Sequence, residues 1–240
     1  MNPKRIMRLL TLLALSLCLA FVTVAFTLPP SPITDTPSSM NFDQTVKISQ
    51  STGMTEFISQ IRNGKSGQLV GIYAPDIMAL PVIQQPAKSP SFVSTAPDTL
   101  TQFGMASQYG TIGILAHNNL AGANFYKFAA GDLVALVYGD GVVKFYQIDR
   151  IQRFQALSPE SPFSNFIELD HPDKQITSTE LFNRIYSHGD PLVFQTCLAV
   201  RGNLSWGRIF VTAKAFSPRQ AAVAGPRVFK VSTPINAFAR

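Results

Sequence analysis

The sequence predicts a mainly β domain, either a sandwich or a closed barrel, behind an N-terminal apolar segment. Two observations favour this fold class. Between residues 66 and 216, short apolar or alternating runs are separated by turn signals, and only one helix is strongly marked. Many short strands with few helices are typical of sandwiches and barrels. With 46% hydrophobic and 14% charged residues among 240, the chain is not a charge-rich disordered protein.

The N-terminus has the pattern of a membrane segment. Residues 9–28 carry no charge, and a helix of that length spans roughly 30 Å of hydrocarbon. The basic residues before it favour a cytoplasmic N-terminus and export of the remainder. A retained single-pass anchor and a cleaved signal peptide both fit, because residues 23–25 (Thr-Val-Ala) are typical of a peptidase site. In both cases the domain works outside the cytoplasmic membrane.

A stalk is expected between this segment and the domain. Proline, serine and threonine dominate residues 29–50, which favours an extended and solvated chain. A short helix is predicted over 54–62, with Asn63-Gly64 as its stop. The chain therefore divides into four segments: an anchor or signal segment (1–28), a stalk with a short helix (29–63), a β domain (64–216) and a basic tail (217–240).

Seven runs in the β domain predict strands, and one segment predicts a helix. Asp140-Gly141 separates two of the runs and favours a tight hairpin. The capping box at residues 177–180 (Thr-Ser-Thr-Glu) begins a helix that is expected to end near Gly189. The C-terminal tail fits either a loose segment or a final strand. The predicted strands are 68–73, 80–83, 111–116, 133–138, 142–148, 192–196 and 209–213.

The formal net charge of +6 suggests a nucleic-acid partner at first sight, but its distribution argues against one. Residues 1–28 hold three basic groups and residues 217–240 hold four, with no acid in either segment. The other 13 basic and all 14 acidic residues lie between them, so the body sums to −1. A nearly neutral body has no basic surface for a phosphate backbone, and no nucleic-acid partner is expected.

Cys197 is the only cysteine in the exported part, since Cys18 lies in the apolar segment. In an oxidising compartment, a cysteine without an internal partner invites mispairing. One interpretation is a buried and inert core thiol. The other is a nucleophile, whose thiolate needs a base or a cation beside it. The residues alone leave both open.

A histidine and an arginine could serve that nucleophile. His117 ends an apolar run and begins a polar loop, where a strand would bring its side chain to a barrel rim. His171 lies in an expected surface turn and His188 near the end of the capped helix, so both are expected to face solvent. Arg208 begins a β-rich run and could donate to an oxyanion. Arg201, four residues after the cysteine, is a rival that is expected in the intervening loop.

These residues in this order resemble the sortases, the cysteine transpeptidases of the bacterial cell surface. The family's mark is a histidine closing a strand, a Thr-Cys pair ending a later strand and an arginine starting the next. Here they stand in 114–117 (Ile-Leu-Ala-His), 192–197 (Leu-Val-Phe-Gln-Thr-Cys) and 206–211 (Trp-Gly-Arg-Ile-Phe-Val). Residues 124–128 and 131–134 look like the family's aromatic-containing loop and its Gly-Asp turn into a strand. The likeness covers roughly residues 66–214.

The chain departs from the family pattern at two places. Ala116 stands before the histidine, where the family usually has glycine. The usual Thr-Leu-x-Thr-Cys appears as Val-Phe-Gln-Thr-Cys over residues 193–197, so only the last pair is kept. Both changes leave the three ionisable groups in order.

The resemblance implies an eight-stranded β-barrel with the active site where these strand ends meet. Cys197 would attack a carbonyl in a sorting motif of an exported protein and form a thioester. His117 would act as general acid and then as general base, and Arg208 would hydrogen-bond the substrate or the oxyanion. Thr196 would contact the substrate. The amine acceptor would be a cell-wall precursor or a pilin lysine, and no cofactor or metal is expected.

Two other functions stay open at the sequence level. A catalytically degenerate exported β-barrel could bind wall polymer or an assembly partner. A hydrolytic cysteine peptidase would share the nucleophile, with water in place of the amine that resolves the thioester.

Overall fold

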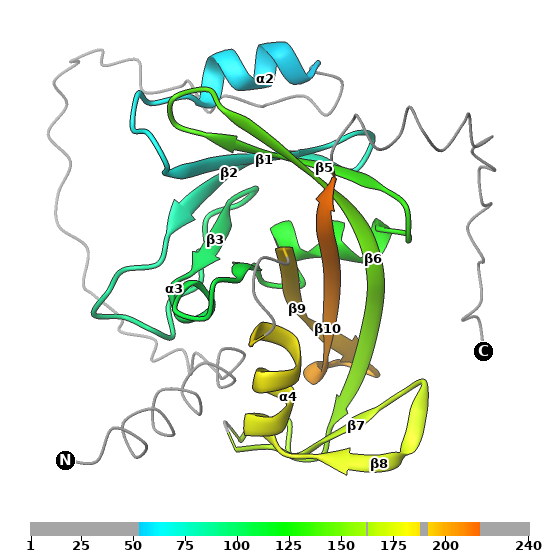
Figure 1. Ribbon diagram of the computed structural model, residues 1–240. Helices are drawn as coiled ribbons and strands as arrows, with labels where there is room; N and C mark the ends of the chain where they lie inside the picture. The colour runs from blue at the N-terminus through cyan, green and yellow to red at the C-terminus, as the bar shows by residue number, and fades with distance from the viewer. Residues whose placement is uncertain (1–52, 162, 188–191, 217–240) are drawn as a thin grey trace, which may run out of the picture.

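The computed structural model describes residues 53–161, 163–187 and 192–216. The predicted membrane segment, most of the stalk, the basic tail and His188 lie outside these residues. Within them, no helix is long and apolar enough to span a membrane. The elements shown in Figure 1 are α2 (Met54–Ile61), β1 (Leu69–Ala74), β2 (Met78–Gln84), β3 (Leu100–Phe103), α3 (Gly104–Ser107), β4 (Ile112–Leu115), η1 (Ala121–Lys127), β5 (Leu133–Tyr138), β6 (Val143–Ala156), β7 (Phe166–Glu168), β8 (His171–Ile176), α4 (Ser178–Tyr186), β9 (Leu192–Val200) and β10 (Asn203–Phe216).

Eight of the strands close into a barrel. The hydrogen-bonded order is β10-β9-β4-β3-β2-β1-β5-β6, and β10 also pairs with β6, which joins the two ends. β7 and β8 extend the sheet beyond β6. The pairs β2–β3 and β4–β9 are parallel and the remaining pairs are antiparallel. The mainly β prediction is confirmed, and the barrel has the eight strands that the resemblance implied.

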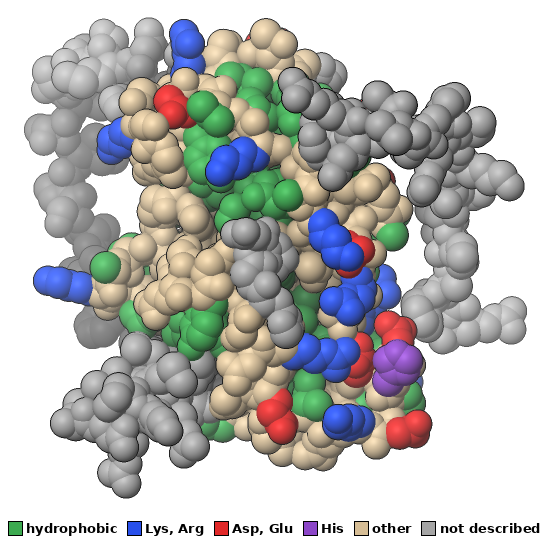
Figure 2. All heavy atoms as spheres, in the orientation of Figure 1, with side chains coloured by type: hydrophobic (Ala, Val, Ile, Leu, Met, Phe, Trp, Pro, Cys, Tyr) green, Lys and Arg blue, Asp and Glu red, His purple; other side chains and the backbone are tan. Residues whose placement is uncertain are grey.

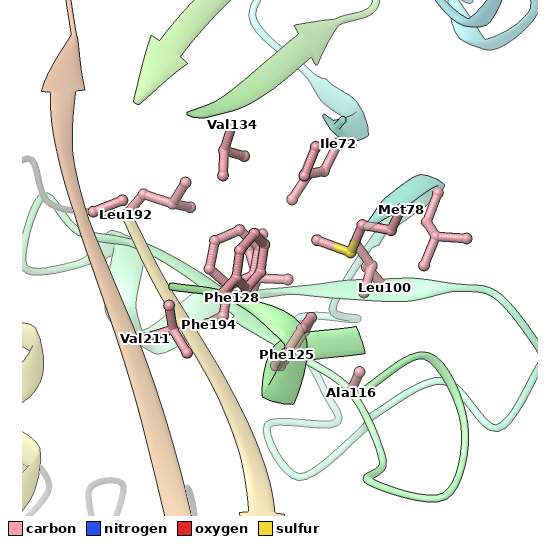
Figure 3. Close-up of a cluster of buried hydrophobic side chains, with 14 of the residues drawn as sticks. Ile72, Met78, Leu100, Ala116, Phe125, Phe128, Val134, Leu192, Phe194 and Val211 are labelled. Atoms are coloured by element: carbon pink, nitrogen blue, oxygen red, sulfur yellow. The ribbon is translucent and has the colours of Figure 1, made fainter. Parts of the chain in front are cut away.

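The main hydrophobic core fills the inside of the barrel. Figure 3 shows Phe125, Phe128 and Phe194 at its centre, and the Phe194 ring centroid lies 5.1 Å from each of the other two. Side chains alternate between the two faces of a strand, so every second residue of β4, β9 and β10 points into this core. The residues between them point outward and are available for a second layer.

That second layer lies on the outer face of β4, β9 and β10. Leu115, Val193 and Phe210 pack there with Phe182 and Tyr186 of α4. The Tyr186 ring meets Phe210 edge-on at 6.3 Å. α4 therefore covers the outer face of the three strands that carry the candidate residues, and it begins at the predicted capping box, which is confirmed at Thr177.

β3, β7 and β8 were not predicted from the sequence, and the turn predicted at His171 is wrong. His171 begins β8 rather than lying in a turn, although its side chain is exposed as expected. Pro172 is tolerated because β8 is the edge of the sheet. Glu168 of β7 is buried; Arg184 donates to it at 2.7 Å and Gln152 at 2.9 Å.

Charged side chains are unevenly spread on the face drawn in Figure 2. They gather at its lower right, over β6, β7 and β8, and both signs are mixed there. The upper part of this face, over β1 and β5, is mostly hydrophobic or uncharged. The charges on this face therefore do not form a surface of one sign.

Candidate active site

Three adjacent strands bring the predicted residues into one row. Arg208 of β10 is the direct register partner of Cys197 on β9. On the other side, Leu115 of β4 is paired with Gln195 of β9, in parallel. His117 follows Leu115 by two residues as Cys197 follows Gln195, so it lies level with the cysteine. Neighbouring strands are about 5 Å apart, so Arg208 and Cys197 lie side by side, and His117 follows the end of the next strand, β4.

The row lies on the outer face of the barrel. Leu115, Val193 and Phe210 belong to the outer cluster under α4, and alternation puts residues two positions further along on the same face. Cys197 and Arg208 therefore lie on the outer face, next to the outer cluster that α4 covers. The sequence analysis expected both at strand ends, but β9 continues to Val200 and β10 begins at Asn203. Their positions are thus set by sheet register and not by loops.

The Cys197 side chain is buried, with 4% of its surface exposed. Its backbone carbonyl accepts a hydrogen bond from the hydroxyl of Tyr126, in η1. The structure has Cys197 in a disulfide whose partner lies outside the described residues. The prediction of a free Cys197 thiol is therefore wrong for this state of the protein. Thiol chemistry at this position requires reduction of the disulfide.

His117 is half-buried in the loop that follows β4. Burial lowers the pKa of its imidazole below 6.5, and a hydrogen bond to the Val93 backbone acts in the opposite direction. The backbone around it is held tightly, since the His117 carbonyl accepts from the N–H groups of Leu120 and Gly122, both at 3.0 Å. A neutral imidazole is the form that can take a proton from a thiol.

Arg208 is the most buried charged residue of the row, with 1% of its surface exposed. Its Nη1 donates to the carbonyls of Gly207, at 2.8 Å, and Ser205, at 3.1 Å. Burial lowers its pKa to about 10, although the carboxylate of Glu160 partly offsets this. At neutral pH the guanidinium keeps its charge. A buried cation on the strand next to a cysteine can favour a thiolate and a developing oxyanion when its side chain faces them.

The remaining predicted residues lie elsewhere. Thr196 points to the inner face, where its buried hydroxyl donates to the Ala116 carbonyl at 2.7 Å. Its binding of a substrate stays a prediction. Arg201, the rival of Arg208, has a φ of +48° in the turn between β9 and β10 and is exposed, as expected for a loop residue. The row therefore contains Arg208 and not Arg201.

Three polar residues near the row were given no role from the sequence. Tyr126 contacts the cysteine backbone, as described above, and Asn118 ties the histidine loop to the β9–β10 hairpin by donating to the Leu204 carbonyl at 2.9 Å. Gln195, two residues before the cysteine, is the third. The pattern Asn118-Asn119 after a strand and the aromatic 124–128 segment were visible signals, but only the fold shows what they touch.

No family model matches the chain, and no curated protein matches it. Solved structures do match. The solved structures that it resembles are sortases. Streptococcus agalactiae sortase C1 is 17% identical, with 70% of this chain and 72% of that chain covered and a TM-score of 0.41. Sortase C-1 from Actinomyces oris is 12% identical, with 69% and 82% covered and a TM-score of 0.42. Clostridium perfringens sortase C with the C-terminal cell wall sorting motif is 17% identical, with 65% and 74% covered and a TM-score of 0.39.

Proposed function

We propose that this protein is a sortase-type cysteine transpeptidase. It cleaves a peptide bond in the sorting motif of exported proteins and transfers the acyl group to an amine. The observation that carries the proposal is that Cys197 has Arg208 as its register partner on the outer barrel face, with His117 just after the end of the neighbouring strand β4. A nucleophile, a proton-transfer group and a fixed cation are the parts that acyl transfer needs.

The first half-reaction forms a thioester. His117 takes the proton of the reduced Cys197 thiol, and the thiolate attacks the carbonyl carbon of the substrate. Arg208 donates hydrogen bonds to the carbonyl oxygen as it becomes an oxyanion. The tetrahedral intermediate collapses when the C–N bond breaks. The imidazolium gives its proton to the leaving amine, which departs with the C-terminal fragment.

The second half-reaction transfers the acyl group. An incoming amine attacks the thioester carbonyl, and neutral His117 accepts its surplus proton. The C–S bond then breaks, and the imidazolium returns its proton to the Cys197 thiolate, so the thiol and the neutral imidazole of the starting state are restored. A wall precursor or a pilin lysine supplies the amine. The apolar segment 9–28 holds the protein at the outer side of the cytoplasmic membrane, in our proposal, so that exported proteins reach the row.

The test uses the full chain reduced with a phosphine, which keeps thiols reduced without cleaving thioesters. Substrate peptides copy exported proteins of the same genome that end in a shared motif, an apolar span and a basic tail. Hydroxylamine serves as the amine, and mass spectrometry follows the hydroxamate product. The parent chain is expected to give the product. Cys197→Ala is expected to give none, and His117→Gln at least about a hundredfold less, in the range usual for loss of a general acid–base.

Cys18→Ala is the matched control, because it removes the only other thiol of the chain and leaves the row intact. It is expected to keep the parent's rate. Peptide processing by Cys197→Ala at the parent's rate would overturn the proposal. A Cys197 thiol that is inert to iodoacetamide, together with no product, would support a degenerate binding barrel. Acid product that hydroxylamine does not divert would support a hydrolytic peptidase.

A further inference from the structure

Gln195 stands out among the buried polar residues of the outer face. It lies on β9 two residues before Cys197, and alternation turns both side chains to the same face. Only 7% of its surface is exposed. A glutamine inside the otherwise apolar run Leu-Val-Phe-Gln of residues 192–195 needs hydrogen-bond partners at such burial.

One end of the Gln195 amide is fixed by α4. The hydroxyl of Tyr186 donates to Gln195 Oε1 at 2.6 Å. Tyr186 is itself fully buried, and its backbone carbonyl accepts from the Thr111 hydroxyl at 2.7 Å. Burial raises the pKa of Tyr186, so its hydroxyl stays protonated and remains a donor. The oxygen of the amide therefore faces α4, and its NH2 group faces away from that contact.

The NH2 end has no hydrogen-bond acceptor among the described residues. A second glutamine gives the contrast: Gln152 of β6 and Gln195 are both register partners of Phe210, one on each side. Gln152 donates its amide to Glu168 at 2.9 Å. Gln195 Nε2 donates to no described residue. It is not completely buried, so solvent can reach it. It is thus a fixed donor that solvent reaches.

Cys197 is the next outward-facing residue after Gln195 along β9. α4 covers the rest of the outer face through Phe182 and Tyr186, whose rings also pack on Phe103 of β3. Successive side chains on one strand face are about 7 Å apart. The Gln195 side chain is long enough to reach a carbonyl group that the Cys197 sulfur attacks.

We propose that the Gln195 amide N–H donates a hydrogen bond to the reacting carbonyl oxygen of the acyl donor as Cys197 attacks. Gln195 is then a catalytic residue beside Arg208, and Tyr186 is a positioning residue that holds the amide in its donor orientation. The inference rests on the proposed function, since it needs acyl transfer at Cys197. Side-chain amides can supply oxyanion donors of this kind.

The test needs no sorting motif. The full chain, reduced with the phosphine and then freed of it, reacts with p-nitrophenyl acetate, whose acyl group passes to the thiol and releases p-nitrophenolate. A second reagent, 2,2′-dithiodipyridine, reports thiol reactivity without any carbonyl. Gln195→Met, which has a similar volume and no amide, is expected to acylate about tenfold more slowly. Its rate with the disulfide reagent is expected to stay within about twofold of the parent's.

Two further variants keep the result interpretable. Gln195→Glu retains the acceptor for Tyr186 and lacks the amide donor, so it is expected to lose acylation at least as strongly while the fold persists. Gln152→Met is the matched control: it removes a buried amide from the same row of side chains, two strands away, and is expected to leave both rates unchanged. Tyr186→Phe is expected to slow acylation a few-fold, with the disulfide rate again kept.

The outcomes separate the two proposals. Equal acylation rates for Gln195→Met and the parent, or a parallel fall with both reagents, would overturn the role of Gln195. Acylation of Cys197→Ala at the parent's rate, or a parent that is not acylated, would overturn the proposed function and the role of Gln195 with it. A tenfold loss confined to the ester would support both.

Discussion

Gly122 offers the sharpest test of how rigidly the histidine loop is joined to the nucleophile strand. It lies in η1, packed against the turn that carries His117. A Cβ at this position would lie 2.5 Å from Thr196 Oγ1, 2.6 Å from the His117 carbonyl oxygen and 2.9 Å from the Ala116 carbonyl oxygen. Two of these atoms are backbone, so Gly122→Ala forces η1 and the His117 turn apart.

The expected cost combines two terms. Overpacking of a closely packed position costs about 1–3 kcal/mol. Displacement of the Ala116 carbonyl also weakens its 2.7 Å bond from the Thr196 hydroxyl, which contributes about 1 kcal/mol more. We therefore expect Gly122→Ala to lower the free energy of unfolding by about 2–4 kcal/mol. Since the His117 carbonyl is one of the displaced atoms, acylation of Cys197 should fall by at least about tenfold, as misplaced catalytic groups lose rate steeply.

Urea unfolding at constant m gives the first quantity, and the p-nitrophenyl acetate rate gives the second. Gly104→Ala is the control. Its new Cβ would meet only Gln85 Oε1, at an ordinary 3.4 Å, and it should change the free energy of unfolding by less than about 1 kcal/mol. The reasoning is refuted if Gly122→Ala is as stable and as reactive as Gly104→Ala, because the histidine loop would then move freely relative to β9.

Three other perturbations follow from the same contacts. Thr196→Val should lower the free energy of unfolding by about 1–2 kcal/mol through loss of a buried bond, whereas Thr99→Val, which removes an exposed bond to Pro97, should change it little in the same urea series. Burial holds the pKa of His117 below 6.5, so the unfolded chain binds more protons than the folded protein near that pH. The free energy of unfolding should therefore fall as the pH drops from about 7.5 to 5.5. His117→Gln should remove this pH dependence, and His171→Gln, at an exposed position, should keep it. Burial opposes the charged form of Glu168, but bonds from Gln152 and Arg184 together hold its pKa below 4.5, so stability should also fall below about pH 4.5, and an unchanged acid limb in Glu168→Gln would contradict this assignment.

The parts of the fold that could be predicted are those with local signals. The capping box at Thr177 starts α4 because hydroxyl and carboxylate satisfy the first N–H groups wherever the helix packs. β5 was predicted to the residue, since an apolar run bounded by Gly-Asp turns has few alternatives. β8 was missed because His-Pro-Asp-Lys favours a turn locally, and only pairing with β7 makes it a strand.

The candidate residues could be proposed from the sequence, but their surroundings could not. Order along the chain and a family resemblance pointed to His117, Cys197 and Arg208. The burial of Arg208 could not be predicted, because the strand was expected to start at the arginine. β10 starts at Asn203 instead, and the Arg208 guanidinium lies 6.0 Å from the ring centre of Phe166. The bond between Tyr186 and Gln195 joins residues whose neighbourhood depends on α4 docking, and no local pattern encodes it.

Sheet register explains why the altered residues around the cysteine leave the row in place. A slip of β9 by one residue would turn Cys197 into the barrel and bring Thr196 outward. Two inward contacts oppose that slip: Phe194 fits between Phe125 and Phe128, and the Thr196 hydroxyl bonds to Ala116 on β4's side. Exchange of the family's Thr-Leu for Val193-Phe194 keeps an apolar pair with the same alternation, and the retained threonine keeps the bond. The contacts that complete the core therefore also fix the outward direction of Cys197 and Gln195.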